Sequence, residues 1–254
     1  MMMATSEPGV IIPDWPAPEG VRAYSTTRTG GISLPPFDSL NLALHVGDDP
    51  AHVMENRAKL KRALKYPGEP AWLEQVHGNH VVDASDCHSP VMADASLTGE
   101  TGKVSVVMTA DCLPVLFCTQ KGSYVAAAHA GWRGLADGIL EVSVERVSGA
   151  AGCDRNEILA WMGPAIGPGA FEVGDEVREV FVHANDVESA FIATRPGHWN
   201  MDIYAVARRR LQDVGVTNIF GGQYCTVSES GRFFSYRRDG QCGRMATMIW
   251  LQHT

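Results

Sequence analysis

The spacing of apolar residues along the chain changes between short continuous runs and a helical repeat. The continuous runs are rich in β-formers, and each is bounded by glycine, proline or a turn. Such runs are typical of buried strands. They predict strands at residues 103–109, 113–119, 123–129, 158–162, 217–220, 232–236 and 245–251.

Segments with helical spacing separate these runs. Asp49 followed by Pro50 is a good helix start, because aspartate caps free N–H groups and proline suits the first helical position. Apolar residues then recur at near-helical spacing as far as Leu64. Asn200 and Asp202 are the two candidate caps of the last predicted helix. The predicted helices cover residues 50–65, 135–148, 174–184 and 200–214.

The mixture of strand blocks and interspersed helices predicts an α+β fold, built as αβ layers with mixed sheets. No internal repeat, low-complexity run or Gly/Ser linker divides the chain, so we expect a single domain over residues 21–254. Residues 1–20 contain four prolines and predict an extended N-terminal lead-in rather than a helix.

Composition narrows the classes of function. The 254 residues are 45% hydrophobic and 20% charged, with a net charge of −8 and no Lys/Arg cluster of the kind that nucleic-acid binding needs. No stretch approaches the roughly 18 apolar residues of a membrane span, and the N-terminus has no signal-peptide pattern. We therefore expect a cytoplasmic protein that binds neither nucleic acid nor membranes. Its six cysteines, without a CxxC pair, are expected to be free thiols.

Three polar segments lie where strands are predicted to end. Cys112 lies between two predicted strands, His129 ends the next one just before a helix, and His77 follows a short apolar stretch upstream. If these strands are neighbours, the three side chains meet. Two imidazoles and one thiolate suit zinc, and three protein ligands with an open fourth position are typical of a catalytic zinc site. Such a metal lowers the pKa of bound water to roughly 7.

The spacing alone leaves another interpretation open. Histidines and cysteines far apart in sequence are common, and His77, Cys112 and His129 form no short ligand motif. Unrelated core or surface side chains would give the same pattern. His80 is a weaker ligand candidate, because three residues of separation place it on the opposite face of a strand from His77.

Charged residues near these strand ends are candidates for substrate contacts. Asp111 is a candidate general base or ligand-orienting group, and capping of a turn explains it equally well. Arg133 lies in a Gly-rich turn before a helix, where backbone N–H groups and the helix dipole favour anions. Arg28 and Arg57 are further anion-binding candidates, although such arginines are most often ordinary surface charges.

Two other segments could shape a pocket. The stretch 163–169 is rich in glycine and proline but lacks the Lys-Ser/Thr of a P-loop, so it predicts a shaped loop rather than a phosphate cradle. Phe233, Phe234 and Tyr236 lie on the predicted strand 232–236. We expect core packing for at least two of these aromatic rings, which leaves one to stack on an aromatic substrate.

Eight longer stretches form a specific combination that covers nearly the whole chain. They are STTRTGGIS (25–33), SLNLALHVGDD (39–49), LEQVHGNHVV (73–82), ADASLTG (93–99), TADCLPVLF (109–117), AAAHAGWRGL (127–135), GPAIGPGAFEVG (163–174) and FFSYRRDGQCGRMA (233–246). In this combination the chain resembles the YfiH-type, laccase-domain family. It shows no departure from the family at His77, Cys112 or His129.

The resemblance implies that these three residues hold zinc, with copper as an alternative metal in the same site. It also implies a YfiH-like catalytic domain related to cysteine-hydrolase-like folds. The implied activities are phosphorolysis of adenosine, inosine, guanosine and methylthioadenosine, and deamination of adenosine. We expect a monomer or homodimer that binds a purine nucleoside and phosphate. The predicted site residues are His77, Cys112, His129 and Asp111 for catalysis and Arg28, Asn41, Arg57, Gln75 and Arg133 for substrate binding.

The predicted site residues suit these activities to different degrees. Deamination fits well, because water activated by zinc can attack C6 of a purine while a carboxylate such as Asp111 moves protons. Phosphorolysis needs a bound phosphate, for which Arg28, Arg57 and Arg133 are candidates. The family name also implies polyphenol oxidation with copper. A multicopper oxidase of the cupredoxin kind needs further histidine clusters, and the chain has nine histidines and no His-x-His.

Two further hypotheses stay open. The resemblance also implies an amide hydrolysis that removes wrongly incorporated serine from peptidoglycan precursors, with Cys112 as nucleophile and His129 as base, or with activated water instead. A module that senses metal or nucleotides without turnover is the non-enzymatic alternative. An open coordination position argues mildly against such a module.

Overall fold

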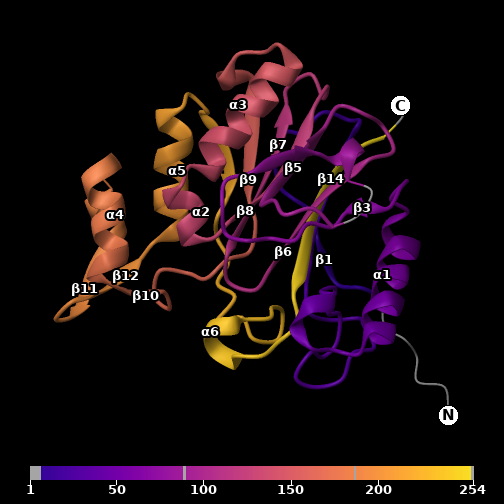
Figure 1. Cartoon of the computed structure of the whole chain (residues 1–254), viewed down its shortest axis with the longest axis horizontal. Helices are drawn as coiled ribbons and strands as arrows, with labels where there is room; N and C mark the ends of the chain where they lie inside the picture. Colours follow the sequence, from indigo (N-terminus) through magenta and orange to yellow (C-terminus); the bar gives the residue numbers. More distant parts are fainter. Residues whose placement is uncertain (1–6, 88–89, 186, 253–254) are drawn as a thin grey trace.

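The computed structural model describes residues 7–87, 90–185 and 187–252. Two β-sheets packed face to face form its centre (Figure 1). In spatial order the first sheet contains β1 (Val10–Ile11), β2 (Val21–Thr26), β14 (Met245–Leu251), β6 (Val104–Thr109) and β3 (Pro70–Ala71). The second contains β13 (Asn218–Gly221), β9 (Ile158–Met162), β7 (Leu113–Thr119), β8 (Val125–Ala130), β5 (Ala95–Thr98) and β4 (Val81–Asp83).

Apolar side chains from both sheets fill the space between them. Val107 and Ile249 of the first sheet and Leu116 and Trp161 of the second belong to one buried cluster. Because strands β6, β7 and β8 are buried along their whole length, they have the continuous apolar sequences from which strands were predicted. The sandwich thus confirms the predicted strand block.

Helices cover the two outer faces. Leu60 of α1 (Pro50–Leu64) packs in the cluster on the outer face of the first sheet. Val144 of α3 (Ile139–Ala151) and Leu211 of α5 (Ile203–Asp213) pack in the cluster on the outer face of the second. The result is a four-layered helix–sheet–sheet–helix arrangement, which confirms an α+β fold with mixed sheets.

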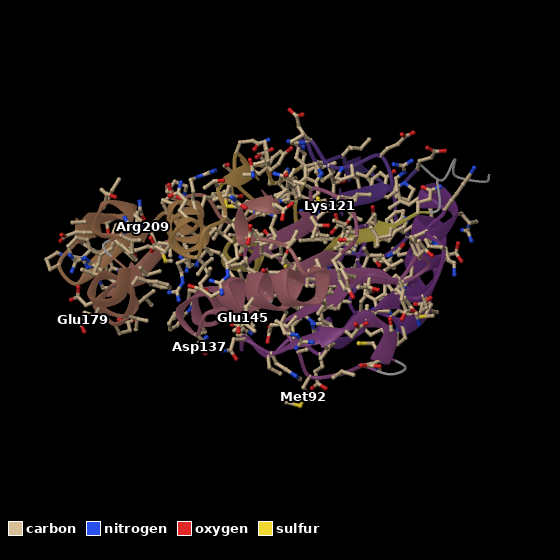
Figure 2. The ribbon with its side chains drawn as sticks, turned by 90° about the horizontal axis from the view of Figure 1, so that it is seen from above. Met92, Lys121, Asp137, Glu145, Glu179 and Arg209 are labelled. Carbon is tan, nitrogen blue, oxygen red and sulfur yellow. The ribbon has the colours of Figure 1, made fainter. Side chains whose placement is uncertain are left out.

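A smaller unit extends from one end of the molecule (Figures 1 and 2). Figure 2 shows Glu179 of its helix at the end opposite α1, with Arg209 of α5 and Glu145 of α3 between. Its sheet consists, in spatial order, of β10 (Glu172–Gly174), β12 (His198–Met201) and β11 (Phe191–Arg195), and its helix is α4 (Asp175–Asn185). The remaining short helices are α2 (Trp132–Ala136), α6 (Tyr236–Asp239), η1 (Leu44–Val46), η2 (Ala84–Asp86), η3 (Arg155–Glu157) and η4 (Glu188–Ala190).

Two predicted helix starts are confirmed by their capping residues. The Asp49 carboxylate accepts a hydrogen bond from the Ala51 N–H, with Pro50 at the first helical position. Asp202, and not Asn200, caps α5, because Asn200 lies in strand β12. Within the described residues, no helix has the length and apolar character needed to cross a membrane.

Two predictions about local structure need correction. The helix expected at 135–148 is two helices, α2 and α3, separated at Gly138, whose φ of 88° is incompatible with a right-handed helix. The strand expected at 232–236 is absent. The adjacent residues Phe233 and Phe234 are both fully buried, and the chain then turns directly into α6. The lead-in also contributes β1, which pairs antiparallel with β2.

Gly138 provides a test of this helix break. A Gly138→Ala substitution must place a side chain at positive φ, and we expect it to lower the free energy of unfolding by about 1 kcal/mol. Gly149→Ala is the matched control: it lies on the exposed side of α3 with open space around its Cβ, and should raise the free energy by about 0.5–1 kcal/mol. Chemical denaturation measures both. Equal effects of the two substitutions would contradict a special role of Gly138.

Candidate metal centre

Three neighbouring segments bring His77, Cys112 and His129 together. Cys112 lies in the turn between β6 and β7, His129 lies near the end of β8, and His77 lies in the loop between β3 and β4. The antiparallel pairing of β7 with β8 places Pro114 opposite His129, so the Cys112 turn reaches the same edge. The candidate ligand atoms lie within 4.8 Å of one another. In the part of the chain that the structure describes, no other group of His, Cys, Asp or Glu side chains is so arranged.

Unusual backbone geometry shapes this centre. His77 and Asp111 have φ values of 63° and 91°, in the left-handed region that non-glycine residues rarely occupy. Such conformations persist where surrounding contacts enforce them, often at functional sites. Gly131 passes so close that a Cβ there would lie 2.9 Å from His77 Cδ2 and 3.1 Å from Cys112 Sγ. Only glycine leaves room for the two ligands.

The buried Asp94 carboxylate holds two of the three candidate ligands in position. Its Oδ1 accepts hydrogen bonds from His129 Nδ1 at 2.8 Å and from the His77 N–H at 2.9 Å. Its Oδ2 accepts from the N–H groups of Gly78 and Val76. A carboxylate on Nδ1 leaves His129 Nε2 free for a metal, an arrangement that is common behind metal-binding histidines.

Electrostatic coupling links Cys112 and His129. Burial raises the pKa of the Cys112 thiol, but attraction to His129 and hydrogen bonds from both histidines outweigh burial and lower that pKa to about 6. Burial likewise lowers the pKa of His129, whereas the Cys112 charge and the Asp94 hydrogen bond raise it to about 9. Without metal, the pair is therefore a thiolate and an imidazolium near neutral pH.

Two cavities adjoin the three candidate ligands, one lined by all of them and the other by His77 and Cys112. The first, which we call the metal cavity, has a volume of about 440 Å³ and is lined by all three ligands together with His45, Gln75 and Arg244. The second, the aromatic cavity, has a volume of about 280 Å³. It is lined by His77, Asp111, Cys112, Trp132, Arg133, Ile166, Phe171, Ile203, Tyr236 and Arg237, among others. Tyr236 lines both cavities and is 61% exposed.

Asp111 lies beside the centre but has other hydrogen-bond partners. Its Oδ1 accepts from the Thr226 hydroxyl, and its Oδ2 accepts from the Arg237 N–H at 2.7 Å. Its carboxylate therefore ties the Cys112 turn to the chain segments around Thr226 and Arg237. This arrangement matches the alternative in which Asp111 stabilises a turn.

The three predicted anion-binding arginines occupy different surroundings. Arg133 lines the aromatic cavity, with its guanidinium 4.5 Å from the Trp132 ring. Arg57 lies outside both cavities, in a neighbouring third one. Arg28 is engaged elsewhere: its side chain donates to the carbonyl groups of Asp38 and Ser230 and pairs with the Asp38 carboxylate at 3.3 Å. The structure therefore does not bring Arg28 to the three ligands.

The two predicted amide side chains hold backbone segments in place. Asn41 is fully buried, and its Oδ1 accepts from the N–H groups of Ala43 and Arg244. The Gln75 amide exchanges two hydrogen bonds of 2.8 Å with the backbone of Met108. Gln75 also lines the metal cavity, so it is placed to meet a ligand there, whereas Asn41 acts through the segment that carries Arg244.

Three residues in the site were not singled out from the sequence. Asp94 and Arg244 lie in stretches that carry the family resemblance, but nothing in their spacing assigns them a role. His45 was likewise not singled out. Tyr236 was one of three aromatic candidates, and the complete burial of Phe233 and Phe234 leaves it as the accessible ring. The sequence signal that could have identified Asp94 is a charged residue directly before an apolar run, here the run that forms β5.

Known proteins are similar to this chain over nearly its whole length. A family model described as multi-copper polyphenol oxidoreductase laccase matches residues 22–252. The chain belongs to this YfiH-type, laccase-domain family. Among laccase-domain relatives, the purine nucleoside phosphorylase YfiH of Escherichia coli is 55% identical over 243 residues, covering 95% of this chain and 98% of the relative. A purine nucleoside phosphorylase of Pseudomonas aeruginosa is 53% identical over 244 residues, with the same coverage.

Solved structures of similar proteins agree with the fold. Protein NMB0706 of Neisseria meningitidis superposes with a TM-score of 0.92 at 44% identity, over 96% of this chain and all of that one. YlmD of Geobacillus stearothermophilus has the same TM-score at 34% identity, over 100% of this chain and 98% of its own. These matches confirm the predicted family.

The Asp94 contact can be tested through metal affinity. We expect Asp94→Asn to weaken zinc binding about 10- to 100-fold, because the amide no longer supplies the negative charge that orients His129. Competition with a chromophoric chelator measures the affinity. Asp49→Asn is the matched control, since Asn caps a helix as well as Asp and Asp49 caps α1. Equal affinities of the two variants would contradict the positioning role.

The thiolate can be tested by alkylation. In metal-free protein at pH 7.5, iodoacetamide should modify Cys112 before Cys118, whose burial raises the pKa to about 12. The rate at Cys112 should fall as the pH drops below about 6, where the thiol becomes protonated. Mass mapping of the adducts over a pH series measures this, and added zinc should protect Cys112. A rate that starts to rise only near pH 9 would contradict the coupled pair.

Proposed function

We propose that this protein is a zinc-dependent purine nucleoside phosphorylase, with cleavage of adenosine and related nucleosides by phosphate as its main reaction. The observation that carries the proposal is a His–Cys–His group beside a cavity that also holds an accessible arginine and an accessible aromatic ring. Relatives named purine nucleoside phosphorylase, similar over nearly the whole chain, support this choice of substrate.

The three ligands suit zinc. Two imidazole nitrogens and one thiolate are ligands that zinc prefers, and three protein ligands leave a fourth position for a ligand oxygen. The Asp94 hydrogen bond supports the same assignment, because it turns Nε2 of His129 toward the other two ligands. Bound zinc would supply a Lewis acid that polarises an oxygen of the substrate or of phosphate.

Arg244 is the best-placed residue to hold phosphate in the metal cavity. Its Nη1 donates to the carbonyl groups of Cys242 and Gly243, which fixes the guanidinium. The described residues offer no acceptor to its Nε and Nη2, so these groups can donate to an oxyanion. Phosphorolysis then requires a phosphate oxygen to bond to C1′ of the ribose while the bond from C1′ to the purine breaks and its electron pair leaves with the base.

Tyr236 is the best-placed residue to stack on the purine. Its ring is accessible and lines both cavities, so a base in the aromatic cavity would lie against it while the sugar reaches the metal cavity. The apolar side chains Ile166, Phe171 and Ile203 complete that cavity. Arg133, at its rim, is a candidate contact for a purine oxygen or a second phosphate oxygen.

Adenosine deamination is the second candidate. The observation in its favour is Asp111, a carboxylate next to Cys112 on the wall of the aromatic cavity. Both of its oxygens already accept hydrogen bonds, which disfavours it as the group that moves protons. We therefore propose deamination only as a side reaction.

Oxidation of phenols receives less support from the ligand set. His₂Cys could hold copper. A multicopper centre of the cupredoxin kind needs further clusters of histidines. Among the described residues, His77, Cys112 and His129 form the one group of side chains that could hold a metal ion.

Product analysis tests the proposal. Zinc-loaded protein mixed with adenosine should release adenine only when phosphate is present, and Cys112→Ala should release none above background. Cys118→Ala, a buried cysteine of β7 outside the centre, is the matched control and should retain activity. Arg244→Met should raise the KM for phosphate about tenfold or more, because a charge-assisted hydrogen bond is lost.

The other outcomes separate the alternatives. Inosine formed without phosphate would make deamination the main reaction. Amide hydrolysis by Cys112 as nucleophile would require chelated protein to be active on a peptidoglycan precursor, since a thiolate bound to metal is a poor nucleophile. Full phosphorolysis by Cys112→Ala would contradict the assignment of the centre.

A further inference from the structure

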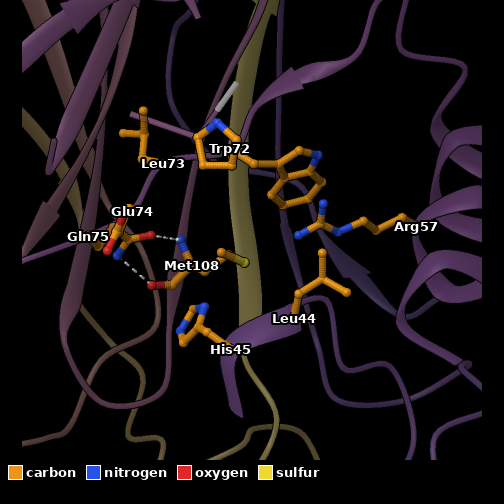
Figure 3. Close-up of a pocket in the computed structure, with 9 residues that line it drawn as sticks. Leu44, His45, Arg57, Trp72, Leu73, Glu74, Gln75 and Met108 are labelled. Atoms are coloured by element: carbon orange, nitrogen blue, oxygen red, sulfur yellow. Dashed lines mark hydrogen bonds between the residues drawn. The ribbon is translucent and has the colours of Figure 1, made fainter. Parts of the chain in front are cut away.

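A third cavity, which we call the annex, lies next to the metal cavity (Figure 3). Its volume is about 470 Å³. The annex and the metal cavity share His45, Gln75 and Met108 as lining residues, so the two spaces meet. The annex is further lined by Leu44, Arg57, Trp72, Leu73, Glu74 and Pro90.

Arg57 is held rigidly in the wall of the annex. Its Nε donates to the Leu42 carbonyl at 2.9 Å, and its guanidinium carbon lies 3.7 Å from the centre of the Trp72 ring. Figure 3 shows the guanidinium reaching from the α1 side to this ring, above Leu44. A cation stacked on an aromatic face is pre-oriented, because the ring restricts its rotation.

The two terminal nitrogens of Arg57 are available to a ligand. Within the described residues neither Nη1 nor Nη2 has a hydrogen-bond acceptor, and neither is among the buried unpartnered atoms, so both are accessible to solvent in a side chain that lines the annex. A guanidinium with both terminal nitrogens free matches the paired oxygens of a phosphate or carboxylate.

No carboxylate of the described residues forms a close ion pair with Arg57. Burial lowers its pKa to about 10, which leaves it positive at neutral pH. The nearby Glu69 carboxylate supports the charge but accepts its hydrogen bond from Trp72 Nε1. Glu74 lies on the opposite wall in Figure 3, so a negative ligand group is favoured on the Arg57 side.

We propose that the annex is an oxyanion subsite in which Arg57, stacked on Trp72, binds a phosphate group. The choice of phosphate over carboxylate rests on the proposed function. A nucleoside 5′-phosphate is one source: its base and sugar would occupy the aromatic and metal cavities while its phosphate enters the annex through the shared boundary at His45 and Met108. Inorganic phosphate is the other source of the same group. The subsite would let the protein bind nucleotides as well as nucleosides.

Calorimetric titration of the zinc-loaded full chain at fixed ionic strength tests the proposal. Wild type should bind adenosine 5′-monophosphate at least about tenfold more tightly than adenosine. Arg57→Met should remove this advantage and leave adenosine affinity unchanged. Arg57→Lys should restore part of it, because lysine keeps the charge but not the paired donors. Arg62→Met, an exposed arginine on the same helix, is the matched control and should change neither affinity.

Titration with inorganic phosphate distinguishes the sources. If Arg57→Met weakens phosphate binding while adenosine and its monophosphate bind equally, the subsite takes free phosphate. Unchanged affinity of folded Arg57→Met for both phosphate ligands would overturn the proposal. So would equal losses of adenosine and nucleotide affinity in Arg57→Met and Arg57→Lys, because that result indicates a structural role. Nucleotide binding that depends on Arg57, found together with no turnover of adenosine, would refute the proposed reaction and leave the subsite standing.

Discussion

The Asp94 carboxylate is the contact on which the geometry of the centre depends. It accepts four hydrogen bonds, three from the backbone of the His77 loop and one from the His129 ring. The Asp94 backbone adds two more ties, since its carbonyl accepts from the His129 N–H and its N–H donates to the His80 carbonyl. A loop with a left-handed histidine is thus joined to a rigid strand. A buried carboxylate without hydrogen-bond donors is energetically unfavourable. The donors of the His77 loop therefore also stabilise the packing of that loop against Asp94.

Positive charge gathers at the cavities although the chain as a whole is acidic. The net charge is −8, yet Arg57, Arg133, Arg237 and Arg244 line the three adjoining cavities. Backbone carbonyl groups accept hydrogen bonds from Arg57, Arg237 and Arg244, which orients these side chains without neutralising them. Such a local field favours anionic ligands while the outer surface repels polyanions. The net charge of the whole chain therefore could not locate this basic interior.

Much of the centre could be predicted because its ligands lie at the ends of continuous apolar runs. Cys112 directly precedes β7 and His129 lies near the end of β8, and the continuous burial of both strands makes them easy to recognise. The helix starts at Asp49 and Asp202 follow from capping chemistry. Sheet order could not be predicted, because β14 pairs with β2 and β6, which are distant in sequence. The role of Asp94 depends on that tertiary pairing as well. The sequence predicts substrate contacts for Arg28 and Asn41, but it does not show the tertiary hydrogen bonds that occupy both side chains in the fold.

The place of β14 in the first sheet has a consequence for the order of folding. This strand, Met245–Leu251, lies between β2 and β6, so the middle of the sheet comes from the last residues described. Strand β6 leads into the turn that carries Cys112, and its neighbour on one side is missing until residue 251 has left the ribosome. During synthesis, the wall behind the Cys112 turn therefore stays incomplete and its apolar face stays open. Premature release of the chain would produce a protein that has all three candidate metal ligands but lacks the strand that supports one of them.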